Sequence, residues 1–145
     1  MSTQRVAIVI GGASGIGWAS AQALAAEGCR IVVADRDADG AAARAAQLGA
    51  PHTSSYADVT DEDSVQKLFE TAGPVDIVLN CAGFSNVGLI TDLAVEDFRS
   101  VVDVCLNGGF IVAKHAGRNL PEGGVLVSIS SLNGRQPAAG ARDQR

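Results

Sequence analysis

Residues 11–17, with the sequence GGASGIG, have the composition and the position of a loop that binds phosphate groups. The apolar run 6–10 comes directly before them and a helical pattern follows, so the loop joins a strand to the N-terminus of a helix. Glycine lets the backbone approach a pyrophosphate without a Cβ in the way, and a helix N-terminus offers N–H groups that have no partner within the helix. This context predicts a dinucleotide-binding loop, and the alternative is a glycine-rich turn that serves packing alone.

A carboxylate at the end of the next apolar run helps to distinguish between NAD and NADP as the bound dinucleotide. Asp35 follows the run 31–34, where a carboxylate accepts hydrogen bonds from both hydroxyls of the adenosine ribose. The same carboxylate would repel a 2′-phosphate, so the sequence favours NAD over NADP. Arg36 acts in the opposite direction, because a guanidinium binds phosphate well. The alternative role for Asp35 is that of a helix cap.

The rest of the chain predicts the elements that position these residues. Apolar and β-branched runs predict strands at 6–10, 31–34, 52–57, 75–79 and 125–129. Helical patterns run from the glycine loop to 26, from 39 to 48, from the N-cap Thr60 to 72, and from 95 to 120. The inner side of the last helix is expected to carry Phe98, Val101, Val102, Cys105 and Leu106.

Strands that alternate with helices at this spacing predict parallel βαβ units with right-handed crossovers. The expected fold class is α/β, a Rossmann-like doubly wound parallel sheet in three layers, α/β/α, with about five strands. We expect one dinucleotide-binding domain over residues 1–145.

Five motifs, in order along the chain, resemble those of the short-chain dehydrogenase/reductase (SDR) family. The GxxxGxG spacing of segment 11–17 is followed by Asp58-Val59, which resembles the family's adenine-contacting pair. Residues 80–83, NCAG, are similar to its NNAG motif, and Asn107 matches its helix asparagine. Ser130-Ser131, followed by Gly134, matches its catalytic-serine segment. One departure is Ile10, which stands where the family usually has a threonine that steadies the loop.

The resemblance implies an oxidoreductase that passes a hydride between the nicotinamide ring of NAD and a carbonyl or alcohol substrate. The serine then positions the substrate oxygen, and the asparagine helps to build a proton-relaying water site. The residues implied in catalysis are Asn107 and Ser131, and those implied in cofactor binding are Gly11, Ser14, Gly15, Ile16, Gly17, Asp35, Arg36, Asp58, Val59, Asn80, Ala82 and Gly83.

Several of these residues also have a purely structural interpretation. Asn80 would tie its strand to a neighbour, Asp58 would be a turn residue, and Ser131 would be an ordinary loop hydroxyl. Asn107 lies within a helical stretch although asparagine is a poor helix former, and that cost favours a functional role.

The family's catalytic tyrosine and lysine, in a YxxxK motif, have no counterpart at the expected spacing. Counting along the family pattern from the serine reaches Gln144. The single tyrosine, Tyr56, is expected to be a packing residue of the third strand, and Lys67 and Lys114 do not have the required spacing. We therefore expect a truncation or frame shift after Gly140, and a chain with little or no turnover. The fifth strand would then be a sheet edge.

Composition and charge narrow the class of protein. With a net charge of −5 and no dense cluster of Lys or Arg, nucleic acid is not an expected partner. Glycines interrupt the uncharged stretch 6–26, which argues against a membrane span or a signal peptide, and we expect a cytoplasmic protein. Cys29, Cys81 and Cys105 lack CxxC spacing, so we expect free thiols and no metal site.

The expected partner is a small-molecule alcohol or ketone, whose identity the sequence does not specify. SDR proteins assemble through the long helix and the segment beyond it, so the usual homo-oligomer is in question for this chain. Two alternatives remain open. A non-catalytic NAD(H)-binding module is favoured by the missing tyrosine and lysine, whereas residues 80–83 and 130–131 argue against an S-adenosylmethionine-dependent methyltransferase.

Overall fold

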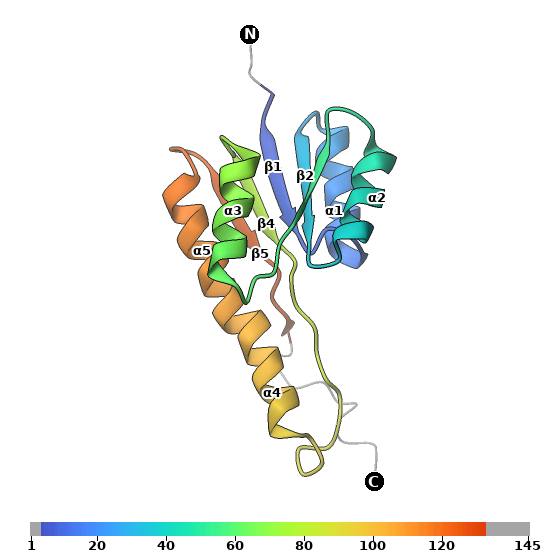
Figure 1. The fold of residues 1–145 in the computed structure, drawn as a ribbon, viewed down its shortest axis with the longest axis vertical. Coiled ribbons are helices and arrows are strands. Elements are labelled where there is room, and N and C mark those ends of the chain that lie inside the picture. Colours follow the sequence, from blue (N-terminus) through green and yellow to red (C-terminus); the bar gives the residue numbers. More distant parts are fainter. Residues whose placement is uncertain (1–3, 133–145) are drawn as a thin grey trace.

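A parallel five-stranded sheet lies between two layers of helices in the computed structural model, which describes residues 4–132 (Figure 1). The strand order is β3-β2-β1-β4-β5. The strands are β1 (Val6–Ile10), β2 (Arg30–Asp35), β3 (Thr53–Tyr56), β4 (Ile77–Asn80) and β5 (Val125–Ser128). The helices are α1 (Gly15–Ala26), α2 (Ala38–Leu48), α3 (Glu62–Ala72), α4 (Val95–Val102) and α5 (Gly108–Asn119), with a π-helical segment, η1 (Asp103–Asn107), between the last two.

The predicted fold class, a Rossmann-like doubly wound sheet in three layers, is confirmed. The chain moves outward from β1 to β3 and then returns to place β4 on the other side of β1. In such sheets the order reverses beside the first strand, and ligands bind there, outside the carboxyl ends of the strands. A ligand site is therefore expected at the carboxyl ends of β1, β2 and β4.

The central strands are apolar on both faces because helices cover both. Ala7, Ile8 and Val9 of β1 have no exposed surface, as a strand within a parallel sheet requires. On one face, Ala7 and Val9 pack in a cluster with α1 and α2, through alanines such as Ala21 and Ala41. The small alanine side chains let these helices approach the sheet closely.

The other face of the sheet is covered by α3 and α5 (Figure 1). The apolar face of α3 packs against the sheet, since Val65, Leu68, Phe69 and Ala72 are all buried. Its predicted N-cap, Thr60, is wrong. The side chain of Asp61 caps the helix by accepting a hydrogen bond from the Asp63 N–H at 3.0 Å.

The cap moves by one residue because the Thr60 hydroxyl has another partner. It donates to Asp58 Oδ1 at 2.7 Å, and the Thr60 N–H donates to the same oxygen at 2.9 Å. This closes a turn around the Asp58 carboxylate and leaves Asp61 as the first residue free to cap. Asp58 therefore does have the turn role that was its alternative interpretation.

The long helical region has the predicted extent, but its predicted inner side is wrong. Phe98 is 59% exposed and Leu106 66%, and no residue of α4 or η1 is buried. Figure 1 shows the reason, since α4 extends beyond the carboxyl ends of the strands and has no sheet opposite it. The buried side of this helical region comes from α5, where Val112, His115 and Ala116 face the core.

Two strands differ from their predicted form. Strand β4 begins at Ile77, not at residue 75, because Gly73 and Pro74 turn the chain and Asp76 Oδ2 accepts the Val6 N–H at 2.8 Å before regular pairing starts. Tyr56 lies on β3 but is 54% exposed, so its predicted packing role is wrong; β3 is an edge strand of the described sheet. The opposite edge is β5, as predicted, where Val125 and Val127 are exposed.

Candidate functional site

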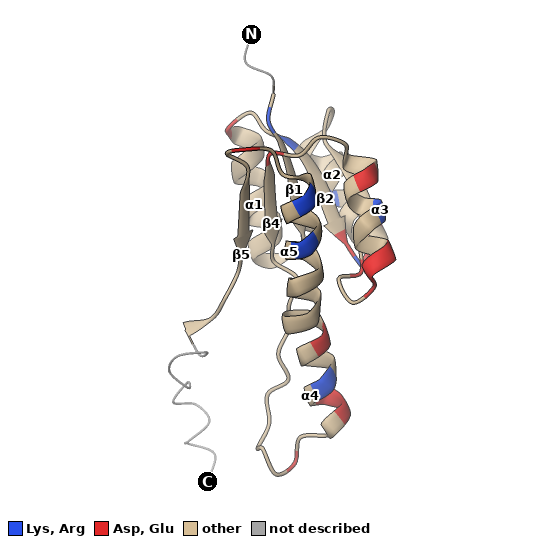
Figure 2. Cartoon of the chain, turned by 90° about the vertical axis from the view of Figure 1, so that its left-hand side faces the viewer, with Lys and Arg blue, Asp and Glu red and all other residues tan. Residues whose placement is uncertain are grey.

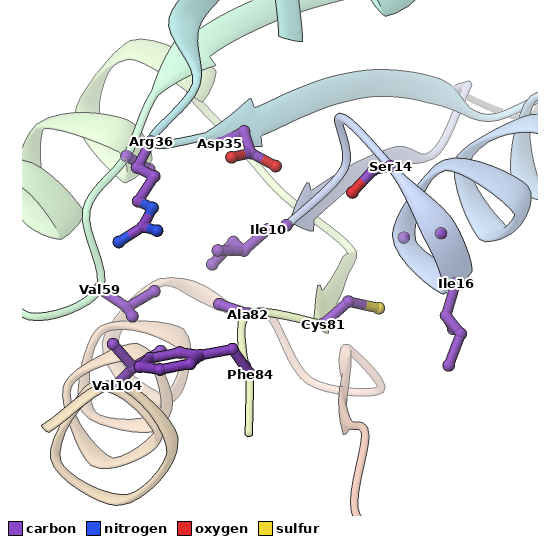
Figure 3. A pocket seen from close by; sticks show the side chains of 15 residues that line it. Ile10, Ser14, Ile16, Asp35, Arg36, Val59, Cys81, Ala82, Phe84 and Val104 are labelled. Atoms are coloured by element: carbon purple, nitrogen blue, oxygen red, sulfur yellow. The ribbon is translucent and has the colours of Figure 1, made fainter. Parts of the chain in front are cut away.

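A cavity of about 370 Å³ opens at the carboxyl ends of β1, β2 and β4, at the position where the strand order reverses (Figure 3). Its walls come from the glycine loop and the start of α1, from the ends of β2 and β4, and from η1. The residues that line it are Ile10, Gly11, Ser14, Gly15, Ile16, Gly17, Asp35, Arg36, Ala57, Val59, Cys81, Ala82, Gly83, Phe84 and Val104.

Packing requires glycine at both ends of the loop. A Cβ on Gly11 would lie 2.9 Å from the Ala82 nitrogen, and the φ of Gly11 is +75°. A Cβ on Gly17 would collide with the Gly11 carbonyl oxygen. The loop therefore folds tightly on itself and against the end of β4, which a side chain at either position would prevent.

The middle of the loop presents bare backbone to the cavity. Gly15 lines the cavity with a φ of +51°, and a Cβ there would meet no atom within 4 Å. Ser14 is the N-cap of α1, yet its side chain makes no capping hydrogen bond, so the N–H groups of the first turn are not capped by it. A helix N-terminus of this kind favours an anion such as a pyrophosphate.

Asp35 and Arg36 stand side by side at the rim of the cavity (Figure 3). Asp35 Oδ2 accepts the Ala13 N–H at 3.0 Å, and Asp35 Oδ1 accepts the Asp37 N–H at 3.0 Å. A carboxylate oxygen accepts more than one hydrogen bond, so both atoms keep acceptor capacity toward the cavity. The Arg36 side chain is exposed and extends over the same opening.

Two of the residues predicted to bind the cofactor, Asn80 and Asp58, do not line the cavity. Asn80 is buried, and its side-chain oxygen accepts the Ala82 N–H at 3.1 Å, which orients the chain where it leaves β4. Asp58 closes the turn that precedes α3. Asn80 therefore supports the backbone of the cavity-lining Ala82, and Asp58 holds Thr60, the residue that follows the cavity-lining Val59.

The two residues predicted to be catalytic do not line the cavity: Asn107 lies in η1, which contributes Val104 to the cavity, and Ser131 lies beyond the carboxyl end of β5. Asn107 is the last residue of the π-helical segment and is exposed, and its Nδ2 donates to Asp103 Oδ1 at 2.9 Å. A π-helical turn inside an α-helix frequently marks a functional site. Ser131 follows β5, which pairs with β4, and is exposed.

Five residues that line the cavity were not predicted from the sequence to bind the cofactor, and they are Ile10, Ala57, Cys81, Phe84 and Val104. Ile10 directly precedes the glycine loop, Ala57 directly precedes the Asp58-Val59 pair, and Cys81 lies within the NCAG segment. Their position next to predicted residues could have indicated all three. Phe84 continues the NCAG segment by one residue. No local pattern indicated Val104, which reaches the cavity because η1 crosses the end of the sheet.

The Cys81 side chain makes one wall of the cavity chemically distinct. It lines the cavity between the loop and the end of β4 and is partly buried. Burial raises the pKa of the Cys81 thiol above its ordinary value of 9.0, because the surroundings disfavour the thiolate. The group is therefore a neutral thiol near pH 7.

Outside the cavity, residues of both charge signs occur on several elements of the described part of the chain. Figure 2 shows Lys and Arg positions scattered over several elements and interspersed with Asp and Glu. Within residues 4–132, no three His, Cys, Asp or Glu side chains gather as metal ligands. In the same residues, no helix has both the length and the apolar character needed to cross a membrane.

The fold, with a cavity at the strand-order reversal, is that of a Rossmann-type α/β protein. The family model of the short chain dehydrogenases matches residues 5–142. Among similar proteins, D-threitol dehydrogenase of Mycolicibacterium smegmatis is 38% identical over 97% of this chain and 56% of its own length. Carbonyl reductase family member 4 of Danio rerio is 39% identical over 94% of this chain and 60% of its own. The chain belongs to the short-chain dehydrogenase family.

A solved structure supports the same assignment. The 3-ketoacyl-(acyl-carrier-protein) reductase from Brucella melitensis, complexed with NADH, superposes with a TM-score of 0.86 at 26% identity, covering 92% of this chain and 60% of that one. The chain thus spans a little over half the length of the relatives that it matches. Family membership removes the methyltransferase alternative.

Proposed function

We propose that this chain is the NAD(H)-binding domain of a short-chain oxidoreductase that interconverts a small alcohol and the corresponding carbonyl compound. The observation that carries the proposal is the cavity at the strand-order reversal, where a glycine loop and the Asp35 carboxylate meet. Ten of the twelve residues predicted to bind the cofactor line it, which a glycine-rich turn used only for packing would not require.

The residues present fit a dinucleotide. Bare backbone at Gly15 and the uncapped start of α1 suit the pyrophosphate, and Asp35 suits the two ribose hydroxyls. The apolar side chains of Val59 and Val104 suit an adenine ring. Asp35 favours NAD(H), because its carboxylate repels a 2′-phosphate more directly than the exposed Arg36 attracts one.

A bound nicotinamide cofactor supplies the hydride acceptor or donor of the reaction. In this chain Ser131 would hold the substrate oxygen, and Asn107 would hold a water that exchanges protons with solvent. Asn107 is exposed in a π-helical turn, where a side-chain amide can bind water while its Nδ2 contacts Asp103. We propose both roles from family resemblance and from their position at the same end of the sheet.

A second function, NAD(H) binding without turnover, is favoured by the position of the single tyrosine. Tyr56 lies on β3, and the sheet order places β3 and β5 at opposite edges, so Tyr56 cannot serve as proton donor beside Ser131. Losing a positioned general acid–base typically lowers the rate about 10²- to 10⁴-fold. We therefore propose that the 145-residue chain alone binds the cofactor and turns over little substrate.

Thermal denaturation of the purified chain with NADH, NADPH and S-adenosylmethionine tests the binding. A ligand that binds only the folded state at 100 times its Kd adds about 2.7 kcal/mol of stability. We expect NADH to raise the melting temperature most, NADPH less, and S-adenosylmethionine not at all. An unchanged melting temperature with NADH at millimolar concentration would overturn the proposal. Oxidation of NADH with a panel of ketones then separates an enzyme from a binding module.

A further inference from the structure

Arg44, on α2, contacts the glycine loop from outside the cavity. Its Nε donates a hydrogen bond to the Ala13 carbonyl oxygen at 3.0 Å, and its Nη1 donates to Gln47 Oε1 at 3.0 Å. The guanidinium also lies over the Trp18 ring, 4.9 Å from the ring centroid. Arg44 is half-buried and does not line the cavity. Three contacts therefore fix a long and otherwise flexible side chain against the loop and the start of α1.

The same loop residue is held from its other side by Asp35. The Ala13 N–H donates to Asp35 Oδ2 at 3.0 Å, so a side chain holds each polar backbone group of Ala13. Helix α2 also packs closely here, since a Cβ on Gly40 would lie 3.2 Å from the Ala13 Cβ. Ala13 is thus the point at which the loop is fastened to β2 and α2.

Within residues 4–132, Asp35 and Arg44 are the only residues whose side chains form hydrogen bonds with segment 11–17. Ile10, directly before the loop, has no polar side-chain atom, and Ser14 makes no capping bond. The main-chain bonds from Gly11 and Gly12 to the Ala34 carbonyl oxygen fix only the start of the loop. The direction of the middle of the loop therefore depends on Asp35 and Arg44.

The geometry of the peptide bond connects Arg44 to the cavity. The Ala13 carbonyl and the Ser14 N–H belong to one planar trans peptide, in which C=O and N–H point in opposite directions. An arginine that holds the carbonyl toward α2 consequently fixes the direction of the Ser14 N–H, and Ser14 lines the cavity. The bond is charge-assisted, which makes it stronger than a bond between neutral groups.

We propose that Arg44 is a positioning residue for the dinucleotide, which orients the phosphate-binding backbone without touching the ligand. The inference rests on the proposed function, because it presumes that segment 11–17 holds the pyrophosphate. It predicts that a change on α2, outside the cavity, weakens cofactor binding.

The test compares R44M and R44K with a matched control, R30M. Arg30 also donates a side-chain hydrogen bond to a main-chain oxygen, that of Ala72 at 3.0 Å, but Arg30 does not line the cavity or contact the loop. Trp18 is the only tryptophan, so energy transfer from Trp18 to NADH reports binding directly. Hydrogen exchange of segment 11–14, measured without ligand, reports on the loop itself.

R44M removes a hydrogen bond from a charged donor, and we expect the Kd for NADH to rise about tenfold. R44K keeps a donor and the charge, so its Kd should lie between those of R44M and the unaltered chain. Amide exchange should accelerate in segment 11–14 of R44M and stay unchanged in the core strand β1. R30M should leave both the Kd and the exchange of the loop unaltered.

An R44M chain that binds NADH within twofold of the unaltered chain would overturn the inference and leave the proposed function standing. If the unaltered chain does not bind NADH, the proposed function fails, and the cofactor role of Arg44 fails with it. Should R44M not fold, R44K decides, because unchanged exchange in its segment 11–14 together with an unchanged Kd rejects the inference.

Discussion

Asp35 Oδ2 accepts the Ala13 N–H at 3.0 Å, so the carboxylate that ends β2 is bonded to the glycine loop that follows β1. The Asp37 N–H holds the other carboxylate oxygen at 3.0 Å. These two bonds orient the carboxylate before any ligand arrives, which lowers the entropic cost of binding. The ribose-binding and phosphate-binding parts of the proposed site are therefore coupled through one side chain.

Replacing Asp35 should change both cofactor affinity and cofactor preference. D35N removes the negative charge and turns one acceptor into a donor, which then faces a backbone N–H. We expect the Kd for NADH to rise about 10- to 100-fold, the range set by losing one or two bonds to a charged group. The Kd for NADPH should rise less, because the repulsion of its 2′-phosphate disappears while Arg36 remains.

Titration of Trp18 fluorescence with both cofactors measures this ratio. D39N is the matched control, since Asp39 is an exposed carboxylate near the start of α2 that does not line the cavity. An equal loss of affinity for NADH and NADPH in D35N would show that Asp35 acts only through the shape of the loop.

A second prediction concerns the tight turn of the loop. G17A adds a Cβ that collides with the Gly11 carbonyl oxygen, so we expect a loss of about 1–3 kcal/mol in the free energy of unfolding. NADH binding should be lost at the same time, because the first turn of α1 moves. G117A is the matched control on α5, where a Cβ meets no atom within 4 Å and alanine should stabilise the helix by about 0.5–1 kcal/mol.

Urea denaturation of G17A and G117A measures both changes in stability. The urea concentration at the midpoint of unfolding reports the change when the dependence of the free energy of unfolding on urea is the same in each chain. A G17A chain as stable as G117A would show that the loop does not need the close approach of Gly11 and Gly17.

The strands and the glycine loop were predictable because local spacing determines them. A short apolar run that ends in glycine and leads into a helix has few structural solutions, and Asp35 and Asn80 lie at strand ends for the same reason. The N-cap of α3 was less predictable, because Thr60 and Asp61 are both good caps. Only the turn around the Asp58 carboxylate, which takes up the Thr60 hydroxyl, decides between them.

The features that could not be predicted from the sequence depend on how distant elements pack against one another. A periodic apolar pattern shows that a helix has an apolar face but not whether a sheet lies opposite, so Phe98 and Leu106 were wrongly placed inward. The role of Val104 in the cavity depends on where η1 crosses the sheet end. The role of Arg44 was not predictable for the same reason, since its contact with Ala13 joins residues that are far apart in sequence.

The contacts of Glu62 with Lys114 and His115 predict an acid-sensitive link between α3 and α5. Glu62 Oε1 lies 2.6 Å from Lys114 Nζ and 3.3 Å from His115 Nε2. The hydrogen bond from Lys114, and then that from His115, hold the pKa of Glu62 below its ordinary value of 4.5. A carboxylate with a lowered pKa in the folded state adds stability above its unfolded pKa, and this stability is lost as pH falls through the folded pKa.

E62Q should therefore lower the melting temperature at pH 7, and the difference from the unaltered chain should shrink below pH 4.5. The effect is small, because the Glu62 side chain is 46% exposed. E27Q is the control, as Glu27 is exposed and forms no ion pair within residues 4–132. A difference between E62Q and the unaltered chain that stays constant from pH 7 to pH 3 would contradict the assignment.

The last prediction uses the thiols as probes of the cavity. Cys105 is exposed, Cys29 is buried, and Cys81 lines the cavity with a raised pKa. Since the thiolate is the reactive form, iodoacetamide at pH 8 should alkylate Cys105 first, Cys81 several times more slowly, and Cys29 only on unfolding. Mass spectrometry of the digested chain follows each site separately.

NADH should slow the alkylation of Cys81 and leave that of Cys105 unchanged. At ten times its Kd, a ligand that covers the thiol leaves about one site in eleven open, so the rate at Cys81 should fall roughly tenfold. A C105S chain removes the competing thiol and gives the cleaner measurement. Equal Cys81 rates with and without saturating NADH would place the cofactor away from the end of β4, and the proposed site would then be wrong where Cys81 lines it.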